Sequence, residues 1–337
     1  MKFHFLYIFI FLGFCAQAQN PIHLNTYLIT GRAQGTTYQI KYFAKDFAVE
    51  KTQIDSVIEE LDLSLSIYRT NSLISSFNNK NTSQVKLDRH LGHVVRASLK
   101  MNKITKGYFD ITVLPLVNLW GFGPNGFKKN PSIHEIDSVL NFVGLKKIKL
   151  KKDQLIKKNN QVSIDVNGIA QGYSVDILAD YLERNGIQNY IVELGGEIKT
   201  KGHKPTGDFI VEIDRPKNSL ENSKHYIVAN NLAVTTSGTY EKRRQYDGSY
   251  ISHHINPKSG YPLKNSVVSV TVIANTAIEA DGLDNYFMSL TPDKAIKEAE
   301  KMKDIAIYLI YSDNNTLKEL QTSNFNKYIY TNQRKPH

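Results

Sequence analysis

The stretch Ser163-Ile-Asp-Val-Asn-Gly-Ile-Ala-Gln-Gly-Tyr-Ser-Val-Asp176 contains a change in the spacing of its apolar residues. They first occur at every second position and then at the spacing of a helix. Residues 163–166 alternate polar and apolar side chains and predict a strand, which Asn167 and Gly168 interrupt. Apolar residues then recur at helical spacing as far as Gly186, and they predict a helix. We therefore expect a strand that runs directly into a helix.

The start of this predicted helix has features of an anion site. Its free N–H groups and the positive end of its dipole can receive a phosphate, and Asp165 lies just before it. Gly168 and Gly172 would let a ligand approach the backbone closely. The same glycines also fit an ordinary tight turn between a strand and a helix. The stretch alone leaves both interpretations open.

The N-terminus differs in composition from the rest of the 337-residue chain. Lys2 precedes an apolar run over residues 3–14, and Ala16-Gln-Ala18 then supplies the small-x-small pattern of signal peptidase cleavage. The apolar run is too short to span a bilayer. We expect residues 1–18 to be a signal peptide and residues 19–337 to be one domain, exported to the periplasm.

The single cysteine, Cys15, lies inside this leader. Residues 19–337 therefore cannot form an internal disulfide and offer no thiol nucleophile or Cys-based metal site. The segment Leu12-Gly-Phe-Cys15 resembles a bacterial lipobox, but Phe14 stands where a small residue is expected. Soluble export is the favoured interpretation, and a lipid anchor to the inner membrane through Cys15 stays open.

The chain carries a formal net charge of +10, and its lysines are densest over residues 146–158. Lysines there alternate with apolar residues, which predicts hairpin strands whose lysines face water and protect a sheet edge. The run lacks aromatic interleaving and any nucleic-acid-binding motif, so no nucleic acid is expected as a partner. The positive charge still favours anionic ligands or a membrane surface.

The remaining pattern predicts an α+β protein. Internal repeats and low-complexity linkers are absent from the sequence, so we expect one compact unit with a mainly antiparallel sheet and flanking helices. The predicted strands lie at residues 26–43 (a pair), 190–194, 209–213, 226–229, 232–235, 267–273 and, as the last, 305–310. The predicted helices lie at residues 54–65, 88–107 and 132–144 and begin again near 276 and 292.

A cluster of oxygen-bearing side chains falls in the helix predicted near residue 276. Asp281, Asp284 and Asn285 stand at i, i+3 and i+4, which places them on one helix face. Magnesium prefers such ligands and completes its shell with water and substrate phosphates. A solvated acidic face near a helix N-terminus is the alternative.

Two further segments are candidates for a cleft. The histidines of His253-His-Ile-Asn-Pro257 follow a predicted strand, and neighbouring strand residues face opposite sides, so at most one should enter a cleft. Two histidines alone do not make a zinc site. Thr236-Ser-Gly238 is a polar turn that could bind a ligand, although a simple loop is its plainer interpretation. The solitary Trp120 lies among apolar residues and is expected in the core.

Taken together and in this order, these motifs resemble the ApbE family of flavin transferases, the FAD:protein FMN transferases, from about residue 31 to residue 290. Gln34-Gly-Thr-Thr-Tyr38 is similar to the family's Met-Gly-Thr segment, with Gln in place of Met. The other matching segments are Leu65-Ser-Ile-Tyr68, Tyr108-Phe-Asp110, residues 115–123, the central stretch, Thr236-Ser-Gly238 and His254-Ile-Asn-Pro257.

The resemblance implies an ApbE-like, T-fold-like unit and a role for each matched position. FAD would contact Gln34, Tyr68, Tyr108, Phe109, Asp110, Asp165, Gln171 and Ile255, and Mg²⁺ would lie between the Gly168 carbonyl and Asp281, Asp284 and Asn285. The chain departs from the family where Gln171 replaces Lys, Asn256 replaces Asp and Asn285 replaces Thr. An amide oxygen can replace a hydroxyl as a metal ligand, but affinity and metal preference change with it.

The activity implied by the resemblance is magnesium-dependent cleavage of FAD. FMN would pass to the threonine of an Asp/Ser-Gly-Ala/Ser-Thr motif in an exported or membrane-associated acceptor protein, with release of AMP. His254 is the expected base, since the unperturbed pKa of histidine is near 6.5. Two alternatives stay open. One is a magnesium-dependent FAD pyrophosphatase that gives FMN and AMP, and the other is a non-enzymatic flavin-binding protein, which the acidic cluster disfavours.

Overall fold

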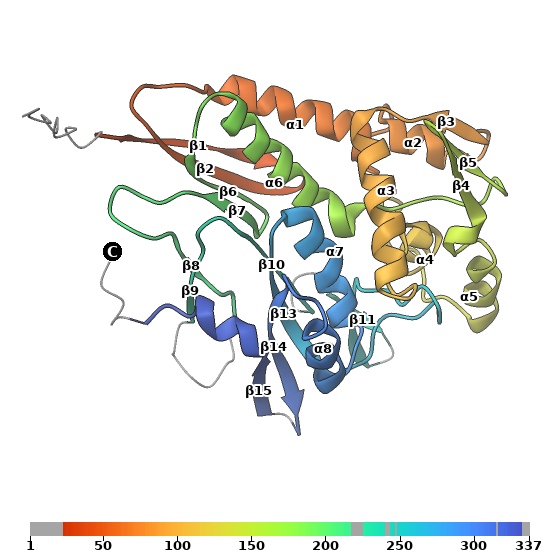
Figure 1. The fold of residues 1–337 in the computed structure, drawn as a ribbon. Coiled ribbons are helices and arrows are strands. Elements are labelled where there is room, and N and C mark those ends of the chain that lie inside the picture. The colour runs from red at the N-terminus through yellow and green to blue at the C-terminus, as the bar shows by residue number, and fades with distance from the viewer. Residues whose placement is uncertain (1–22, 217–224, 240–242, 247, 315, 332–337) are drawn as a thin grey trace, which may run out of the picture.

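The computed structural model describes residues 23–216, 225–239, 243–246, 248–314 and 316–331 (Figure 1). An eight-stranded sheet, in which every pair of neighbours is antiparallel, forms the centre of the fold. Its strands, in spatial order, are β1 (Asn25–Ala33), β2 (Thr36–Ala44), β6 (Asn189–Leu194), β7 (Glu197–Lys201), β10 (Ala233–Gly238), β13 (Val267–Ala274), β14 (Ala306–Asp313) and β15 (Thr316–Gln321).

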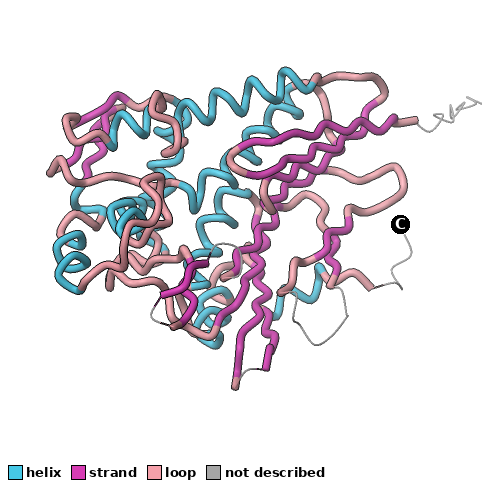
Figure 2. Tube along the Cα trace, turned by 180° about the vertical axis from the view of Figure 1, so that it is seen from behind, coloured by secondary structure: helices cyan, strands magenta, loops and turns pink. Residues whose placement is uncertain are grey.

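Three smaller sheets accompany it. Their strands are β3 (Gln84–Lys86), β5 (Gln154–Lys157) and β4 (Ile148–Lys151) in the first, β8 (Ile210–Glu212) and β9 (Tyr226–Val228) in the second, and β11 (Arg243–Tyr246) and β12 (Ser249–Ser252) in the third. The view from behind shows the large sheet in one part of the molecule, while most helices and the three-stranded sheet make up the other (Figure 2).

Eight α-helices and three short 3-10 helices lie in the described residues. The α-helices are α1 (Lys51–Leu65), α2 (Leu73–Asn78), α3 (Arg89–Ile104), α4 (Leu114–Leu119), α5 (Ile133–Leu140), α6 (Asn167–Arg184), α7 (Ala277–Met288) and α8 (Pro292–Ala299). The 3-10 helices are η1 (Ile111–Val113), η2 (Leu145–Lys147) and η3 (Ser323–Tyr328). In the described part of the chain no helix is both long and apolar enough to cross a membrane.

Side-chain caps explain where two of these helices begin. The Asp88 carboxylate accepts a hydrogen bond of 2.8 Å from the Leu91 N–H at the start of α3. Ser132 and Glu135 form a reciprocal capping box at the start of α5. The helix starts that the sequence predicts at residues 88 and 132 are therefore confirmed. The predicted fold class, with a mainly antiparallel sheet and flanking helices in one unit, is confirmed as well.

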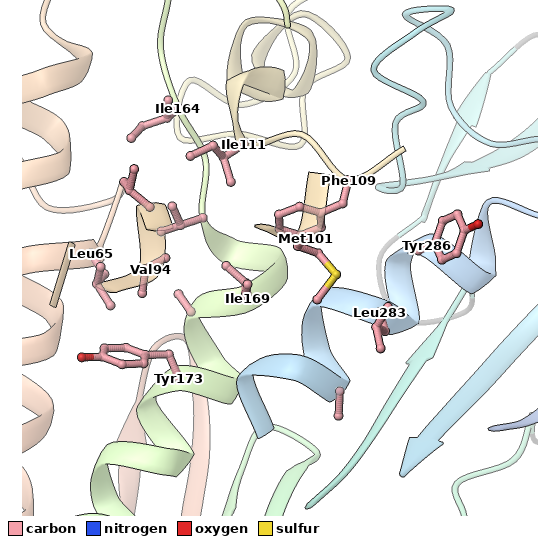
Figure 3. Close-up of a cluster of buried hydrophobic side chains, with 14 of the residues drawn as sticks. Leu65, Val94, Met101, Phe109, Ile111, Ile164, Ile169, Tyr173, Leu283 and Tyr286 are labelled. Atoms are coloured by element: carbon pink, nitrogen blue, oxygen red, sulfur yellow. The ribbon is translucent and has the colours of Figure 1, made fainter. Parts of the chain in front are cut away.

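A buried apolar cluster joins α3, α6 and α7 (Figure 3). Met101 of α3, Ile169 of α6 and Leu283 of α7 meet there, and Phe109, from the loop before η1, packs with them. Each such side chain contributes about 1.5–3 kcal/mol when it is fully buried. The cluster therefore holds three helices together that are far apart in the sequence. Trp120 is also fully buried, as predicted.

The predicted strand at residues 163–166 is wrong. Ile164 and Val166 are fully buried, which accounts for the alternating pattern, but the segment pairs with no strand. Its backbone is held by other groups. The Asn78 side chain donates to the Ile164 carbonyl at 2.8 Å and accepts from the Ile164 N–H at 2.7 Å, and the Asp165 N–H donates to the Ile111 carbonyl. An alternating burial pattern was thus produced without a sheet.

Three other predictions have different outcomes. Residues 305–310 do not form the last strand, because β14 is followed by β15. The lysine hairpin of β4 and β5 is present, but Lys157 is buried rather than facing water: its Nζ donates to the Asn79 carbonyl at 2.9 Å and lies over the Phe77 ring. The predicted leader, residues 1–18 with Cys15, lies outside the described residues.

Candidate active site

All the residues predicted for the site line one cavity of about 830 Å³. This volume lies in the upper part of the range for cofactor-sized ligands. The cavity residues from the prediction are Gln34, Tyr68, Tyr108, Phe109, Asp110, Asp165, Gly168, Gln171, His254, Ile255, Asp281, Asp284 and Asn285. The fold thus brings residues from the turn after β1 through to α7 together around one cavity. Their individual roles remain predictions.

The floor of the cavity is the place where α6 meets α7. A Cβ atom on Gly172 would lie 2.3 Å from the Ala277 carbonyl oxygen and 2.7 Å from the Asp281 Cβ, so only glycine fits there. The Gly172 N–H donates to Asp281 Oδ2 at 2.8 Å. The prediction that Gly172 opens the backbone to a ligand is therefore wrong. This glycine lets the two helices touch and lets the Asp281 carboxylate reach the backbone of α6.

The neighbouring carboxylate on α7 is just as firmly placed. Asp281 and Asp284 are 4% and 2% exposed, which excludes a solvated acidic face. Asp284 Oδ2 accepts from the Thr235 hydroxyl at 3.2 Å, and Asp284 Oδ1 accepts from Asn285 Nδ2 at 2.9 Å. Burial of carboxylates is costly without compensation, so two at one spot are consistent with a cation as ligand.

Gly168 lies opposite Asn285 at the start of α6. Its dihedral angles, φ −80° and ψ 20°, are not helical, and a Cβ atom added to it would lie 3.0 Å from Asn285 Nδ2. The backbone of α6 is therefore kinked at Gly168, next to Asn285. Two carboxylates, an amide and a backbone carbonyl form a donor set of hard oxygens, and this set fits Mg²⁺.

The fit depends on backbone and amide oxygens. Across the residues that the structure describes, no group of three or more His, Cys, Asp and Glu side chains lies close enough to hold a metal ion. Only two of the predicted ligands, Asp281 and Asp284, are carboxylates. The donor set therefore suits a hard cation that also takes water and substrate oxygens.

His254 lies beside this floor and is 5% exposed. Its Nδ1 lies 3.1 Å from Asn285 Oδ1, and the Gly238 backbone also hydrogen-bonds the buried ring. Burial lowers the pKa of His254 to about 4, and hydrogen bonds to Asn285 and to the Gly238 backbone only partly oppose this. The ring is therefore neutral at pH 7, which is the form that accepts a proton.

Both histidines line the cavity, so the prediction that at most one would enter it is wrong. The alternation rule fails because strand β12 ends at Ser252, before either histidine. The two rings lie with their centroids 4.0 Å apart. His253 is therefore part of the cavity wall, next to His254, which lies beside the floor.

The rim of the cavity is more open than its floor. Gln34 sits in the turn between β1 and β2 with φ 50°, and its Nε2 donates to the Ser174 hydroxyl at 2.9 Å. Tyr68, in the loop between α1 and α2, is 57% exposed, and burial of its remaining part raises its pKa. An exposed ring at a cavity mouth offers a stacking surface for a planar ligand.

The segment Tyr108-Phe-Asp110 contributes one wall. Lys258 Nζ lies 4.0 Å above the centre of the Tyr108 ring, and Phe109 is buried in the cluster of Figure 3. Asp110 accepts hydrogen bonds from the Thr112 N–H, the Thr112 hydroxyl and the Leu145 N–H, while burial raises its pKa. Its visible role is to cap η1 and hold this wall in place.

The remaining predicted residues lie between floor and rim. Asp165 Oδ1 accepts from the Asn167 N–H at 2.9 Å, just before α6. A Cβ atom on Gly195 would lie 3.0 Å from Gln171 Nε2, which places the Gln171 side chain beside the β6–β7 turn. Ile255 forms an isolated bridge with Pro262. These contacts hold all three residues at the cavity.

The replacement of the family's Asp by Asn256 has a local explanation. Asn256 Oδ1 accepts from the Lys258 N–H at 2.9 Å, and its N–H donates to the Tyr261 carbonyl. A carboxylate oxygen would accept the same bond from Lys258. An amide can therefore replace an acid here without changing the turn.

Sequence reasoning missed several cavity residues. Asp62 and Arg69 belong to α1 and the following loop, and Glu197 begins β7. Burial raises the pKa of Asp62, partly offset by a hydrogen bond from Gln34. None of these residues carries a local sequence signal. Arg69, for example, is expected from sequence to pair with the exposed Glu59, and it does bind Glu59 at 2.5 Å. Only the folded arrangement of α1, the loop after it and β7 around the cavity reveals them.

Comparisons with known proteins identify related sequences. The sequence profile of the ApbE family matches residues 34–309. The chain is 35% identical to an FAD:protein FMN transferase of Haemophilus influenzae, over 90% of this chain and 91% of that protein. It is 34% identical to one of Vibrio cholerae, over 94% and 96%.

Solved structures give the same result. The flavin transferase ApbE from Vibrio cholerae superposes with a TM-score of 0.83 at 33% identity, covering 90% of this chain and 99% of that one. The apo form of Pseudomonas stutzeri flavinyl transferase ApbE superposes with a TM-score of 0.83 at 30% identity, covering 92% and 98%.

Proposed function

This chain belongs to the ApbE family and is a transferase of the FAD:protein FMN type, and we propose that it uses Mg²⁺ to attach FMN to a threonine of an exported acceptor protein. One observation supports the proposed use of Mg²⁺ and the proposed transfer to threonine. A buried oxygen donor set, a neutral histidine and an open aromatic rim share one cavity. Phosphoryl transfer depends on metal-ion electrostatics, on a group that takes the proton of the nucleophile and on positioning of the substrate, and these three parts would supply them.

The floor supplies the site for the phosphates. Asp281, Asp284, Asn285 and the Gly168 carbonyl would hold Mg²⁺. When bound, the ion neutralises charge on the pyrophosphate of FAD and holds it in line for attack. The predicted anion site at the start of α6 gains no support from its backbone, because the Asn167 N–H donates to Asp165 Oδ1 and the Ile169 and Ala170 N–H groups donate to the Val166 carbonyl.

The residues at the rim of the cavity would orient FAD. Tyr68 and Tyr108 stand at the cavity wall, where aromatic rings can stack on the planar parts of FAD. Gln34 is fixed by Ser174, and a fixed amide can accept from or donate to a ring edge. The aromatic residues thus position FAD so that its pyrophosphate lies over the floor, where a misplacement of about 1 Å can cost 10²-fold in rate.

His254 supplies proton transfer. Its neutral ring would take the proton of the acceptor threonine hydroxyl. The threonine oxygen then forms a bond to the phosphorus of the FMN half of FAD. The bond from that phosphorus to the bridging oxygen breaks, and AMP leaves with the electron pair. FMN remains joined to threonine through a phosphoester, and neutral imidazole is restored when the proton passes to water.

Location and acceptor belong to the same proposal. The leader and the absence of a later cysteine support export to the periplasm, either as a cleaved soluble protein or anchored through Cys15. N-terminal sequencing of the exported protein distinguishes a chain that starts near Gln19 from a lipid-modified Cys15. The acceptor would be an exported or membrane-associated protein with an Asp/Ser-Gly-Ala/Ser-Thr motif.

AMP release decides between transfer and hydrolysis. The protein is incubated with FAD, with Mg²⁺ or with EDTA, in the presence and absence of a protein that carries the threonine motif. A transferase releases AMP fastest with both Mg²⁺ and acceptor, and the amount of AMP equals the FMN bound to protein. AMP release that is independent of the acceptor, with FMN free in solution, would support a pyrophosphatase instead.

A further inference from the structure

The floor of the cavity depends on the register of α6 against α7, which lie side by side in Figure 3. Gly168 faces Asn285, because a Cβ atom added to it would lie 3.0 Å from Asn285 Nδ2. One turn further along α6, the Gly172 N–H donates to Asp281 Oδ2 at 2.8 Å. A step of four residues forward along α6 is thus matched by a step of four residues back along α7. The two helices are therefore antiparallel.

Asp176 continues this row of α6 by one more turn and meets the start of α7. Its Oδ1 accepts from the Ala277 N–H at 3.0 Å, and its Oδ2 accepts from the Ile278 N–H at 2.9 Å. The Asp176 side chain is only 16% exposed. Since Ala277 lies four residues before Asp281, this third contact has the same register as the other two.

The start of α7 is capped from α6 and not by its own sequence. Over the described ranges, the side chain of Thr276, the N-cap of α7, makes no capping hydrogen bond. The first N–H groups of a helix need acceptors, and a carboxylate also favours the positive end of the helix dipole. Asp176 supplies both. Lys199 of β7 joins this junction, since its Nζ lies 3.9 Å from Asp176 Oδ1 and donates to the Asn275 carbonyl just before α7.

We infer that Asp176 is a positioning residue for the metal site: it fixes the start of α7 on α6, and thereby the register in which Asp281 and Asn285 face the start of α6. The inference deepens the proposed function and rests on it, since it concerns residues proposed to hold Mg²⁺. Asp176 is not among the residues that line the cavity. It would act through the backbone of α7, without contact to the metal or to FAD.

The Gly172 N–H reports this register without any metal, because its acceptor is the Asp281 carboxylate. Across the whole sequence, glutamine precedes glycine only at Gly35 and Gly172. In protein labelled with ¹³C-carbonyl glutamine and ¹⁵N-glycine, an HNCO spectrum therefore shows these two amides alone. Gly35→Asn removes one of them and identifies the Gly172 signal. Hydrogen exchange of Gly172 is then followed in the metal-free protein.

Two variants separate the register from the cap. Asp176→Ala removes the link between the helices, and adding Thr276→Asp to it gives α7 a local cap without restoring that link. Asp88→Ala, which removes the cap of α3, is the matched control. We expect Tm to fall by about 2–4 °C in Asp176→Ala and in Asp88→Ala, and to recover in the double variant.

Hydrogen exchange and metal affinity should follow the link between the helices and not Tm. Exchange of the Gly172 amide should become at least about 10-fold faster in Asp176→Ala and in the double variant, and change less than about 3-fold in Asp88→Ala. The Mg²⁺ affinity, measured by calorimetric titration with Mg²⁺ alone, should weaken about 10-fold in the first two proteins and stay within about 2-fold in the control.

Two results would overturn the inference. One is wild-type Gly172 exchange or wild-type Mg²⁺ affinity in Asp176→Ala. The other is recovery of either quantity in the double variant, which would make Asp176 a helix cap and nothing more. A wild type that binds no Mg²⁺ would contradict the proposed function instead, while exchange in the metal-free protein would still decide the role of Asp176.

A second variant covers the case that Asp176→Ala does not fold. Asp176→Asn keeps the shape of the side chain and one acceptor oxygen, so one of the two bonds to α7 is lost. Exchange of the Gly172 amide should then be at least about 3-fold faster than in the wild type. Unchanged exchange in this variant would contradict the inference.

Discussion

The floor and the rim of the cavity are built in different ways. At the floor, α6 and α7 touch through Gly172, and the carboxylates of Asp281 and Asp284 are buried and hydrogen-bonded. At the rim, Tyr68 is 57% exposed and belongs to a loop. The floor is therefore closely packed and hydrogen-bonded, whereas the rim is partly open to solvent.

The difference assigns different tasks to the two regions. In-line phosphoryl transfer depends on fixed positions, which the buried floor supplies. Recognition of a large planar ligand tolerates small shifts, which the rim permits. Substitutions in the floor should therefore lower turnover or stability strongly, and substitutions at the rim should mainly weaken FAD binding.

The largest effect is expected for Asp281→Ala. The variant loses a metal ligand, so magnesium-dependent AMP release should fall below detection while the protein stays folded. AMP formation is measured across a Mg²⁺ titration, with circular dichroism as the control for folding. Asp293→Ala, in α8 and away from the cavity, is the matched control and should behave like the wild type. Normal turnover of Asp281→Ala at saturating Mg²⁺ would remove Asp281 from the metal site.

His254→Ala should follow, with a loss of 10²–10⁴-fold in the rate of transfer. The FAD affinity should change little, because a base acts on the proton of the attacking hydroxyl and not on the bound flavin. Single-turnover transfer and FAD titration of the same variant give the two values. Equal losses in both would make His254 a residue that positions FAD.

The contact between α6 and α7 is tested by Gly172→Ala. The added methyl group meets backbone at 2.3 Å, so the free energy of unfolding should fall by about 1–3 kcal/mol or more. Gly92→Ala in α3 is the matched control, since the nearest neighbour of its methyl group is the flexible end of Arg96 at 3.0 Å and Leu87 Cβ lies at an ordinary contact distance of 3.6 Å. That change should be neutral or stabilise by up to about 1 kcal/mol. Equal destabilisation in denaturant titrations would contradict the tight floor.

The smallest effect is expected at the rim. Tyr68→Ala removes an exposed ring worth about 0.5–1.5 kcal/mol in stacking, which corresponds to a roughly 2- to 10-fold weaker FAD affinity with little change in kcat. Tyr68→Phe keeps the ring and should bind FAD like the wild type. A drop in kcat as large as that of a floor variant would remove the distinction between floor and rim.

The sequence was most informative where chemistry is local. Capping at Asp88 and at Ser132 needs only residues three apart, and the spacing of Asp281, Asp284 and Asn285 needs only one helix. The family motifs added the residues that share no local pattern, such as Gln34 and Tyr68. All of them line the cavity, although their contacts with FAD stay predictions.

The errors arose where distant segments decide the outcome. Residues 163–166 alternate because Ile164 and Val166 enter the core, but the Asn78 side chain takes the place of a partner strand. Gly172 looked like a ligand contact and proved to be the point where α7 packs. Lys157 looked exposed and is buried under the Asn79 carbonyl and beside Phe77. No window of sequence contains both partners of these contacts.

The central claim is transfer of FMN to protein, and one assay tests it most directly. The enzyme, FAD and Mg²⁺ are combined with an exported protein that bears the threonine motif, and the denatured products are examined for flavin fluorescence. We expect a fluorescent acceptor that survives denaturation and disappears when its threonine becomes alanine. We expect the enzyme itself to stay unlabelled. The segment of its sequence most similar to the threonine motif, Asp247-Gly-Ser-Tyr250, ends in tyrosine instead of threonine. Free FMN and AMP as the only products, with every acceptor that bears the motif, would contradict the account.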